Sequence, residues 1–407
     1  MSVLALFAGL LFVYGLVSAR IERVATAPIV FTLAGIIAPR LVPGLRSPDY
    51  HLERFLWVAE FGLVLLLFTD ATRTDLALLR KIQSLPARLL GPGLLLTIGL
   101  GALVALVLLR ELALWEACIV GAILAPTDAG LGQVIVESPR VPARIREALN
   151  VEAGLNDGLS VPFLLFFMAL AGAAGGSTEA SFAVFVGQQL GLGVLVGAGI
   201  GLAGGWLLQR AIDASTITES FLPRGVVALP VFCYFVSDAV GASMFIAAFV
   251  AGLTVQRSYR GAGEHAVEFA AQWGQLFNLA IFFLFGLTVD RALPMLDPVF
   301  FVYGALSLTL IRMLPVAIAL AGTGLDRSTT LFMGWFGPRG LASIVLGLVF
   351  VEQELHTTGE TTILGVVIAT VLMSILLHGF SAGPGIAWYA RQAGRPPAPV
   401  SGAGDTG

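Results

Sequence analysis

Charged residues are scarce in this sequence of 407 residues: they make up 12% of it, against 57% hydrophobic residues. Soluble domains carry about 25% charged residues, and a soluble fold of this length would need a charged surface that this chain cannot supply. A net charge of −3 offers no basic surface for nucleic acid. The two cysteines lie in apolar runs and indicate neither a disulfide framework nor a cysteine metal site. The composition therefore excludes soluble enzymes and nucleic-acid binders and predicts a polytopic protein in the lipid bilayer.

Long apolar runs fill most of the chain. A transmembrane helix needs about 20 mostly apolar residues. Thirteen candidate spans meet this requirement, at residues 2–19, 26–42, 55–71, 89–109, 113–136, 148–173, 181–209, 222–237, 240–256, 270–289, 298–321, 328–351 and 361–383. We therefore expect an all-α polytopic membrane protein of about 13 transmembrane helices.

The loops between the spans predict the orientation. With the N-terminus outside, most of the 23 Lys and Arg residues fall in cytoplasmic loops, as the positive-inside rule requires. This places the C-terminus in the cytoplasm and the chain in the cell membrane. We expect a transmembrane domain over residues 1–384 and a short flexible cytoplasmic tail over residues 385–407, which contain a proline-rich segment.

Two spans contain a helix-breaking proline next to an ionisable residue. Pro126 precedes Thr127 and Asp128 in the fifth span, and Pro338 precedes Arg339 in the twelfth. Proline removes a backbone donor and clashes with the preceding turn, so both helices should be interrupted. If spans 1–6 and 8–13 are two inverted repeats, both interruptions fall in the fifth helix of a six-helix unit. Matched interruptions indicate the midplane site of a secondary transporter, and two unrelated proline kinks are the alternative.

The sixth span carries two acids within the membrane, where a charge costs about 2.5–3.5 kcal/mol even on lenient scales. Glu152 and Asn156 are four residues apart and share a helix face, whereas Asp157 lies about 140° around the helix from Glu152. The two acids should therefore have different partners. We expect Glu152 to form a structural ion pair with the buried Arg339, which leaves Asp157 to bind a cation or a proton. Asp128 either joins that site or caps the helix that follows it.

These residues resemble a known family, the monovalent cation/proton antiporters of the sodium/proton exchanger type. The resemblance covers most of the chain and rests on Leu65 to Asp70, Pro126-Thr127-Asp128, Glu152-x-x-x-Asn156-Asp157-Gly158, Gly337-Pro338-Arg339-Gly340 and Ser374 to Gly379. It implies a homodimer with a dimerisation domain from spans 1–3 and 7–10. It also implies a mobile core domain from spans 4–6 and 11–13, in which the two broken helices cross.

The resemblance further implies residue roles. Asp157 would be the carboxylate that cation and proton share. Thr127 and Asp128 would lie near the ion at the first crossover, which makes these three residues the expected ligands of a monovalent cation. Asn156 would hold the crossing backbone, and Asp70 would be an acid near the ion path. The Asn156–Asp157 pair resembles the electroneutral branch, which exchanges one cation for one proton.

One position departs from the pattern of some relatives, which carry a serine hydroxyl where this chain has Ala153. The ligand list and the preference between Na⁺ and K⁺ therefore stay open. We expect an antiporter that exchanges Na⁺ or Li⁺ for H⁺, with a K⁺/H⁺ antiporter as the alternative. A cation channel or a sensor without transport is a third hypothesis. The sequence contains no nucleophile elbow, P-loop or zinc motif, so we expect no enzyme activity and no cofactor beyond the transported ion.

Overall fold

The computed structural model describes residues 3–22, 24–42, 52–73, 85–174, 187–259, 263–353 and 357–392, and their regular structure is helical throughout. Eight helical segments in these ranges are long and apolar enough to cross a membrane, and four shorter apolar helices accompany them. The predicted all-α polytopic fold is therefore confirmed. The count of thirteen spans and their division into two repeats stay predictions.

The helices follow one another along the chain with few irregular segments. Their bounds are α1 (Val3–Ile21), α2 (Ala27–Leu41), α3 (Leu52–Arg73), α5 (Leu85–Arg88), α6 (Leu94–Leu108), α7 (Leu114–Ile123), α8 (Ala129–Val136), α9 (Ala143–Ala174), α11 (Gly193–Asp213), α12 (Leu222–Val240), α13 (Met244–Ser258), α14 (Gly263–Ala292), α15 (Pro298–Leu308), α16 (Leu310–Ala319), α17 (Arg327–Trp335), α18 (Leu341–Glu352) and α19 (Glu360–Gln392). Short π-helical turns, Leu89–Gly93 and Gln188–Leu192, lead into α6 and α11.

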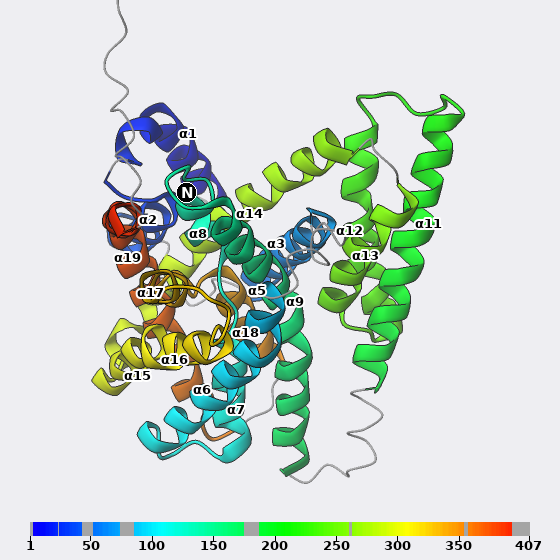
Figure 1. Cartoon of the computed structure of the whole chain (residues 1–407). Helices are drawn as coiled ribbons and strands as arrows, with labels where there is room; N and C mark the ends of the chain where they lie inside the picture. The colour runs from blue at the N-terminus through cyan, green and yellow to red at the C-terminus, as the bar shows by residue number, and fades with distance from the viewer. Residues whose placement is uncertain are drawn as a thin grey trace, which may run out of the picture.

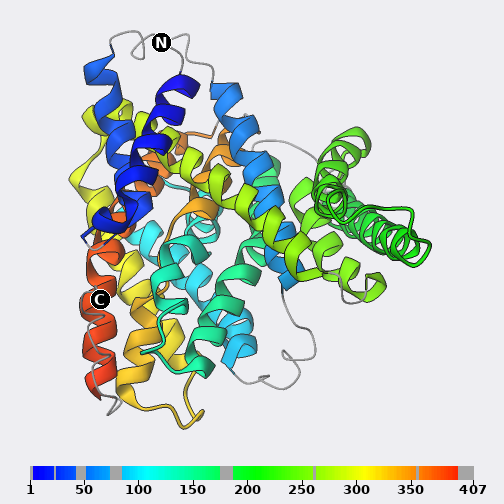
Figure 2. The ribbon, with the colours of Figure 1, turned by 90° about the horizontal axis from the view of Figure 1, so that it is seen from above.

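The helices pack in two groups. In the first group, α13 packs against α11 and α3, and α14 packs against α2 and α3. In the second group, α7 packs against α6 and α9, and α19 packs against α15, α17 and α18. Figure 1 shows α11, α12 and α13 together at one end of the molecule, well away from α6, α7 and α15, and Figure 2 shows the same separation from above. The groups meet mainly where α3 contacts α9 and α18, where α13 contacts α9, and where α2 contacts α19.

Small residues allow the closest contact within the first group. Gly193, Gly197, Gly201 and Gly205 recur at every fourth position of α11 and are buried. A Cβ atom at Gly201 would lie 2.5 Å from the carbonyl oxygen of Ala251 in α13. Only glycine fits this approach, as expected for small-residue packing between membrane helices.

Both predicted helix interruptions are present, and they cross. Helix α7 ends at Ile123 and α8 begins at Ala129, while α17 ends at Trp335 and α18 begins at Leu341. Between them, the backbone N–H of Asp128 donates a hydrogen bond to the carbonyl oxygen of Pro338, at 2.8 Å. The first helix already ends at Ile123, ahead of Pro126, because proline also disfavours the helical conformation in the residue before it.

The predicted flexible tail begins too early. Helix α19 continues through Pro384 to Gln392, so the prediction is wrong for residues 385–392. The side chain of Tyr389 is buried, stacks on Phe332 of α17 and forms a 2.9 Å hydrogen bond with the Thr329 hydroxyl. This packing stabilises the helical conformation of the residues that follow Pro384. Residues 393–407 lie outside the described residues.

Candidate ion-binding site

A cavity of about 360 Å³ leads from the surface to the crossing of the broken helices. Its mouth carries the exposed polar side chains of Gln133, Glu137 and Asn150. Its inner end carries Asp128 and Asp157, which are 5% and 9% exposed. The polar lining at both ends gives a hydrated ion a path to two buried carboxylates.

Asp157 projects into this cavity from α9. Within the described part of the chain, its buried Oδ1 atom has no hydrogen-bond partner. Asp70 and Asp128 lie close enough to interact with it electrostatically. Buried polar atoms in folded proteins are almost always satisfied, and a bare carboxylate oxygen is especially costly. A proton or a cation at this oxygen would remove that cost.

Asn156 connects α9 to the first crossing segment. Its side-chain amide donates a 2.6 Å hydrogen bond to the hydroxyl oxygen of Thr127, and both side chains are buried. The bond fixes the position of Thr127 within the interruption between α7 and α8. The sequence pattern therefore located a residue that holds the crossing segment, although the contact is made to a side chain rather than to the backbone.

Asp128 caps two half-helices at once. Its Oδ1 accepts a hydrogen bond from the backbone N–H of Leu131 in α8, at 2.9 Å, and its Oδ2 accepts one from Leu341 in α18, at 2.5 Å. Both helix N-termini carry partial positive charge, which one carboxylate stabilises. A side chain at Gly340 would collide with this carboxylate. The observed hydrogen bonds of Asp128 are therefore those of a helix cap. That Asp128 also binds the cation directly stays a prediction.

The expected ion pair between Glu152 and Arg339 is wrong. Both carboxylate oxygens of Glu152 accept hydrogen bonds from Arg312 of α16, at 2.5 and 2.9 Å. Glu152 is 2% exposed and Arg312 is 4% exposed, so the pair is fully enclosed. A bidentate arginine–carboxylate geometry is the strongest arrangement for such a pair.

Arg339 has a different task at the crossing. Its Nη1 atom donates to the carbonyl oxygens of Ala125 and Pro126, at 2.6 and 3.0 Å. The interruption after α7 leaves these carbonyls without helical donors, at the end of a helix where the partial charge is negative. The guanidinium supplies hydrogen-bond donors to both carbonyls, and its positive charge compensates the partial negative charge at this helix end. Arg312 and Arg339 both lie inside predicted spans, at residues 298–321 and 328–351, and the sequence gives no signal for which one reaches Glu152.

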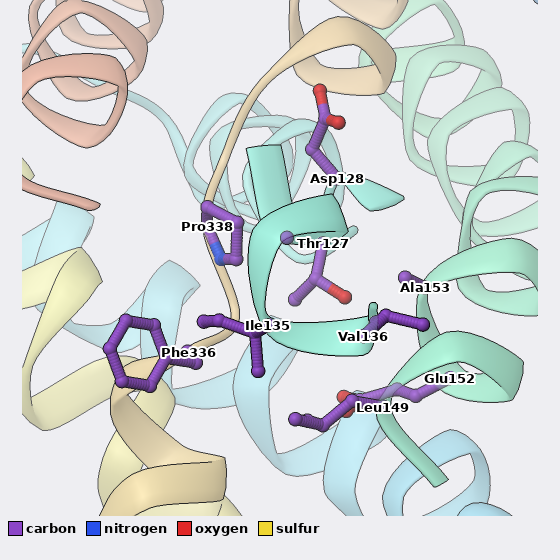
Figure 3. A pocket seen from close by; sticks show the side chains of 10 residues that line it. Thr127, Asp128, Ile135, Val136, Leu149, Glu152, Ala153, Phe336 and Pro338 are labelled. Carbon is purple, nitrogen blue, oxygen red and sulfur yellow. The ribbon is translucent and has the colours of Figure 1, made fainter. Parts of the chain in front are cut away.

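Asp70 and Ala153 line two different spaces next to α9. Asp70 comes from α3 in the other helix group and lines the main cavity, and a Cβ atom at Gly154 would lie 3.3 Å from the Asp70 Cβ. Ala153 instead faces a separate space of about 10 Å³, shown in Figure 3, which Thr127 and Glu152 also line. That volume is at the lower limit for one water molecule. The alanine methyl offers no oxygen to an ion.

Sequence reasoning missed Asn278 of α14. This side chain lines the same main cavity as Asp157. The signal was an uncharged polar residue inside an apolar stretch, between Phe277 and Leu279. A search restricted to charged residues passes over such a position.

Two interrupted helices that cross beside buried carboxylates define a secondary transporter of the broken-helix class. A family model described as the transmembrane sodium/hydrogen exchanger matches residues 3–388. The chain belongs to the sodium/hydrogen exchanger family. This is a family of transporters rather than enzymes, in agreement with the expected lack of enzyme activity.

Several named proteins are similar to the chain. It is 26% identical over 364 residues to the K(+)/H(+) antiporter NhaP2 of Shewanella oneidensis, covering 87% of this chain and 61% of that protein. It is 25% identical over 386 residues to the K(+)/H(+) antiporter NhaP of Alkalimonas amylolytica, covering 93% and 66%. A Na(+)/H(+) antiporter of Schizosaccharomyces pombe is 27% identical over 302 residues, covering 65% and 63%. The chain thus spans 61% to 66% of the length of these curated relatives.

A solved structure shares the fold. The sodium proton antiporter MjNhaP1 from Methanocaldococcus jannaschii superposes with a TM-score of 0.74 at 19% identity, covering 95% of this chain and 97% of that one. At this identity the likeness concerns the fold alone.

Proposed function

We propose that the chain is a secondary antiporter that exchanges a monovalent cation, Na⁺ or Li⁺, for H⁺, with Asp157 carrying each in turn. The observation that carries this proposal is the buried Oδ1 atom of Asp157 at the inner end of the cavity, which has no hydrogen-bond partner among the described residues. Membership of the sodium/hydrogen exchanger family supports it, as do the names of the antiporters that the chain resembles. One carboxylate that alternates one cation with one proton moves no net charge, so the exchange is 1:1 and electroneutral.

The ligands in this proposal are Asp157 and Thr127, with Asp70 near the ion path. Asp128 acts mainly through its charge, because both of its oxygens accept hydrogen bonds from helix N-termini. K⁺/H⁺ exchange is the second candidate. It is favoured by two relatives named as K(+)/H(+) antiporters and by Ala153, which removes one ligand that would help to define a small site.

Alternating access in this proposal moves one helix group against the other. The group of α5 to α9 and α15 to α19 is the mobile core, and the group of α1 to α3 and α11 to α14 forms the homodimer. The sparse contacts between the groups support this division.

The cavity opens to the cytoplasm in this proposal. Its mouth lies where α8 ends and α9 begins, near Glu137 and Asn150. Arg140 lies in the connection between these helices, and Arg144 and Arg146 lie in the first turn of α9. Positively charged connections favour the cytoplasmic side. The described structure is therefore an inward-facing state of a cell-membrane protein with its N-terminus outside.

The proposed function predicts cation-driven proton movement in proteoliposomes that hold a pH dye. Addition of Na⁺ or Li⁺ should change the internal pH, and K⁺ should do so less. In the Na⁺ experiment, a valinomycin clamp at several potentials should leave the rate unchanged, because no net charge crosses. If none of the three cations changed the internal pH, antiport would be contradicted. A response to K⁺ alone would establish the second candidate. A steep voltage dependence would contradict a single shared carboxylate.

A further inference from the structure

Asn278 reaches the crossing of the broken helices from the opposite helix group. It lies within α14, and its side chain packs against the first turn of α8. A Cβ atom at Gly130 would lie 2.5 Å from its Nδ2 atom and 3.1 Å from the Oδ1 atom of Asp128. Glycine at position 130 therefore leaves room for the amide group of Asn278 beside the first turn of α8.

The amide oxygen of Asn278 is unsatisfied. Among the described residues, nothing donates a hydrogen bond to this buried Oδ1 atom, and the same holds for the Oδ1 atom of Asp157. Both side chains line the same cavity. An amide oxygen can only accept, so a water hydrogen or a cation must meet it if the cost of its burial is to be removed.

The chemistry of the two oxygens suits a partly dehydrated alkali cation. Such ions replace their water with oxygen ligands, and uncharged carbonyl oxygens serve as well as carboxylates. A neutral ligand adds affinity without adding a second titrating group. It therefore leaves the exchange of one cation for one proton at Asp157 unchanged.

Because Asn278 belongs to α14, its contact with the ion should depend on the conformation of the protein. Helix α14 packs against α2, α3 and α12, whereas Asp157 and Thr127 belong to the other group. Movement of one group against the other would withdraw Asn278 from the ion while Thr127 stays with Asp157.

Building on the exchange reaction proposed above, we propose that Asn278 is a cation ligand that acts only while this cavity is open. It raises the affinity for the cation at the face on which the cavity opens and has no effect on affinity at the opposite face.

The test measures the cation Michaelis constant separately at each face, in everted and in right-side-out membrane vesicles. Asn278→Leu, which removes the oxygen and keeps the volume, should raise this constant roughly tenfold at the cavity face, equivalent to about 1.4 kcal/mol. It should leave the constant at the other face unchanged. Asn278→Gln, which keeps an uncharged amide oxygen, should stay closer to the unaltered protein at the cavity face and should leave the constant at the other face unchanged. Asn278→Ala is a second oxygen-free variant in case leucine prevents folding.

Gln272→Leu is the matched control, because Gln272 is an exposed amide on the same helix and does not line the cavity. It should change neither constant. Equal effects of Asn278→Leu on the constants at both faces would show a purely structural role and overturn the inference. No effect at either face would also overturn it. In both cases the unaltered protein still exchanges ions and the proposed function survives. Absence of exchange by the unaltered protein would overturn both.

Discussion

Asp157→Asn is expected to abolish cation/proton exchange, down to the background rate of empty liposomes, while the protein stays folded. The amide has the shape of the carboxylate but cannot take up a proton or bear the charge that attracts a cation. Little stability should be lost, because the Oδ1 atom of Asp157 has no hydrogen-bond partner in the described structure. The measurement pairs the pH-dye assay with a thermal unfolding scan of the purified variant.

Glu137→Gln is the matched control for this variant. It removes a carboxylate from the exposed mouth of the same cavity and leaves the inner end intact. Exchange should continue at close to the normal rate. Full exchange by the Asp157→Asn protein would show that another group carries the proton.

Glu152→Ala and Arg312→Ala should each lower the free energy of unfolding by about 3–5 kcal/mol, because each leaves an uncompensated charge in a buried site. The double variant should cost much less than the sum, since neither charge is then left alone. Thermal or denaturant unfolding in one detergent would measure the four proteins of this cycle.

The same cycle with Arg339→Ala separates the observed pair from the one that the sequence suggested. Arg339 donates to the carbonyl oxygens of Ala125 and Pro126, so its loss should combine with Glu152→Ala more nearly additively. A larger coupling of Glu152 to Arg339 than to Arg312 would contradict the arrangement described above.

The crossed helices could be predicted from local sequence. Pro126 and Pro338 act on the backbone of their own helices, and a charged residue close behind each proline indicates a site rather than a simple kink. The end of α19 could not be predicted in this way. Pro384 has the same local effect, but the burial of Tyr389 against α17 outweighs it.

The candidate site was predictable where its residues are neighbours in sequence and unpredictable where they are distant. Asn156 and Asp157 lie on one helix, and the pattern that they form with Thr127 is specific. The partner of Glu152 is 160 residues away. The choice between Arg312 and Arg339 depends on where α16 and the crossing segment lie in space, and spacing along the chain does not encode this. Asn278 was passed over because its side chain is uncharged, and its place at the site depends on a cavity built from helices of both groups.

The central claim is that cation and proton take turns on one carboxylate, and the dependence of exchange on pH tests it most directly. The cation Michaelis constant and the maximal rate should be measured in proteoliposomes over a series of pH values. If both ions compete for Asp157, lowering the pH raises the Michaelis constant in proportion to the proton concentration, and the maximal rate changes little. A Michaelis constant that stays fixed while the maximal rate falls would contradict the claim, because protons would then act at a second site.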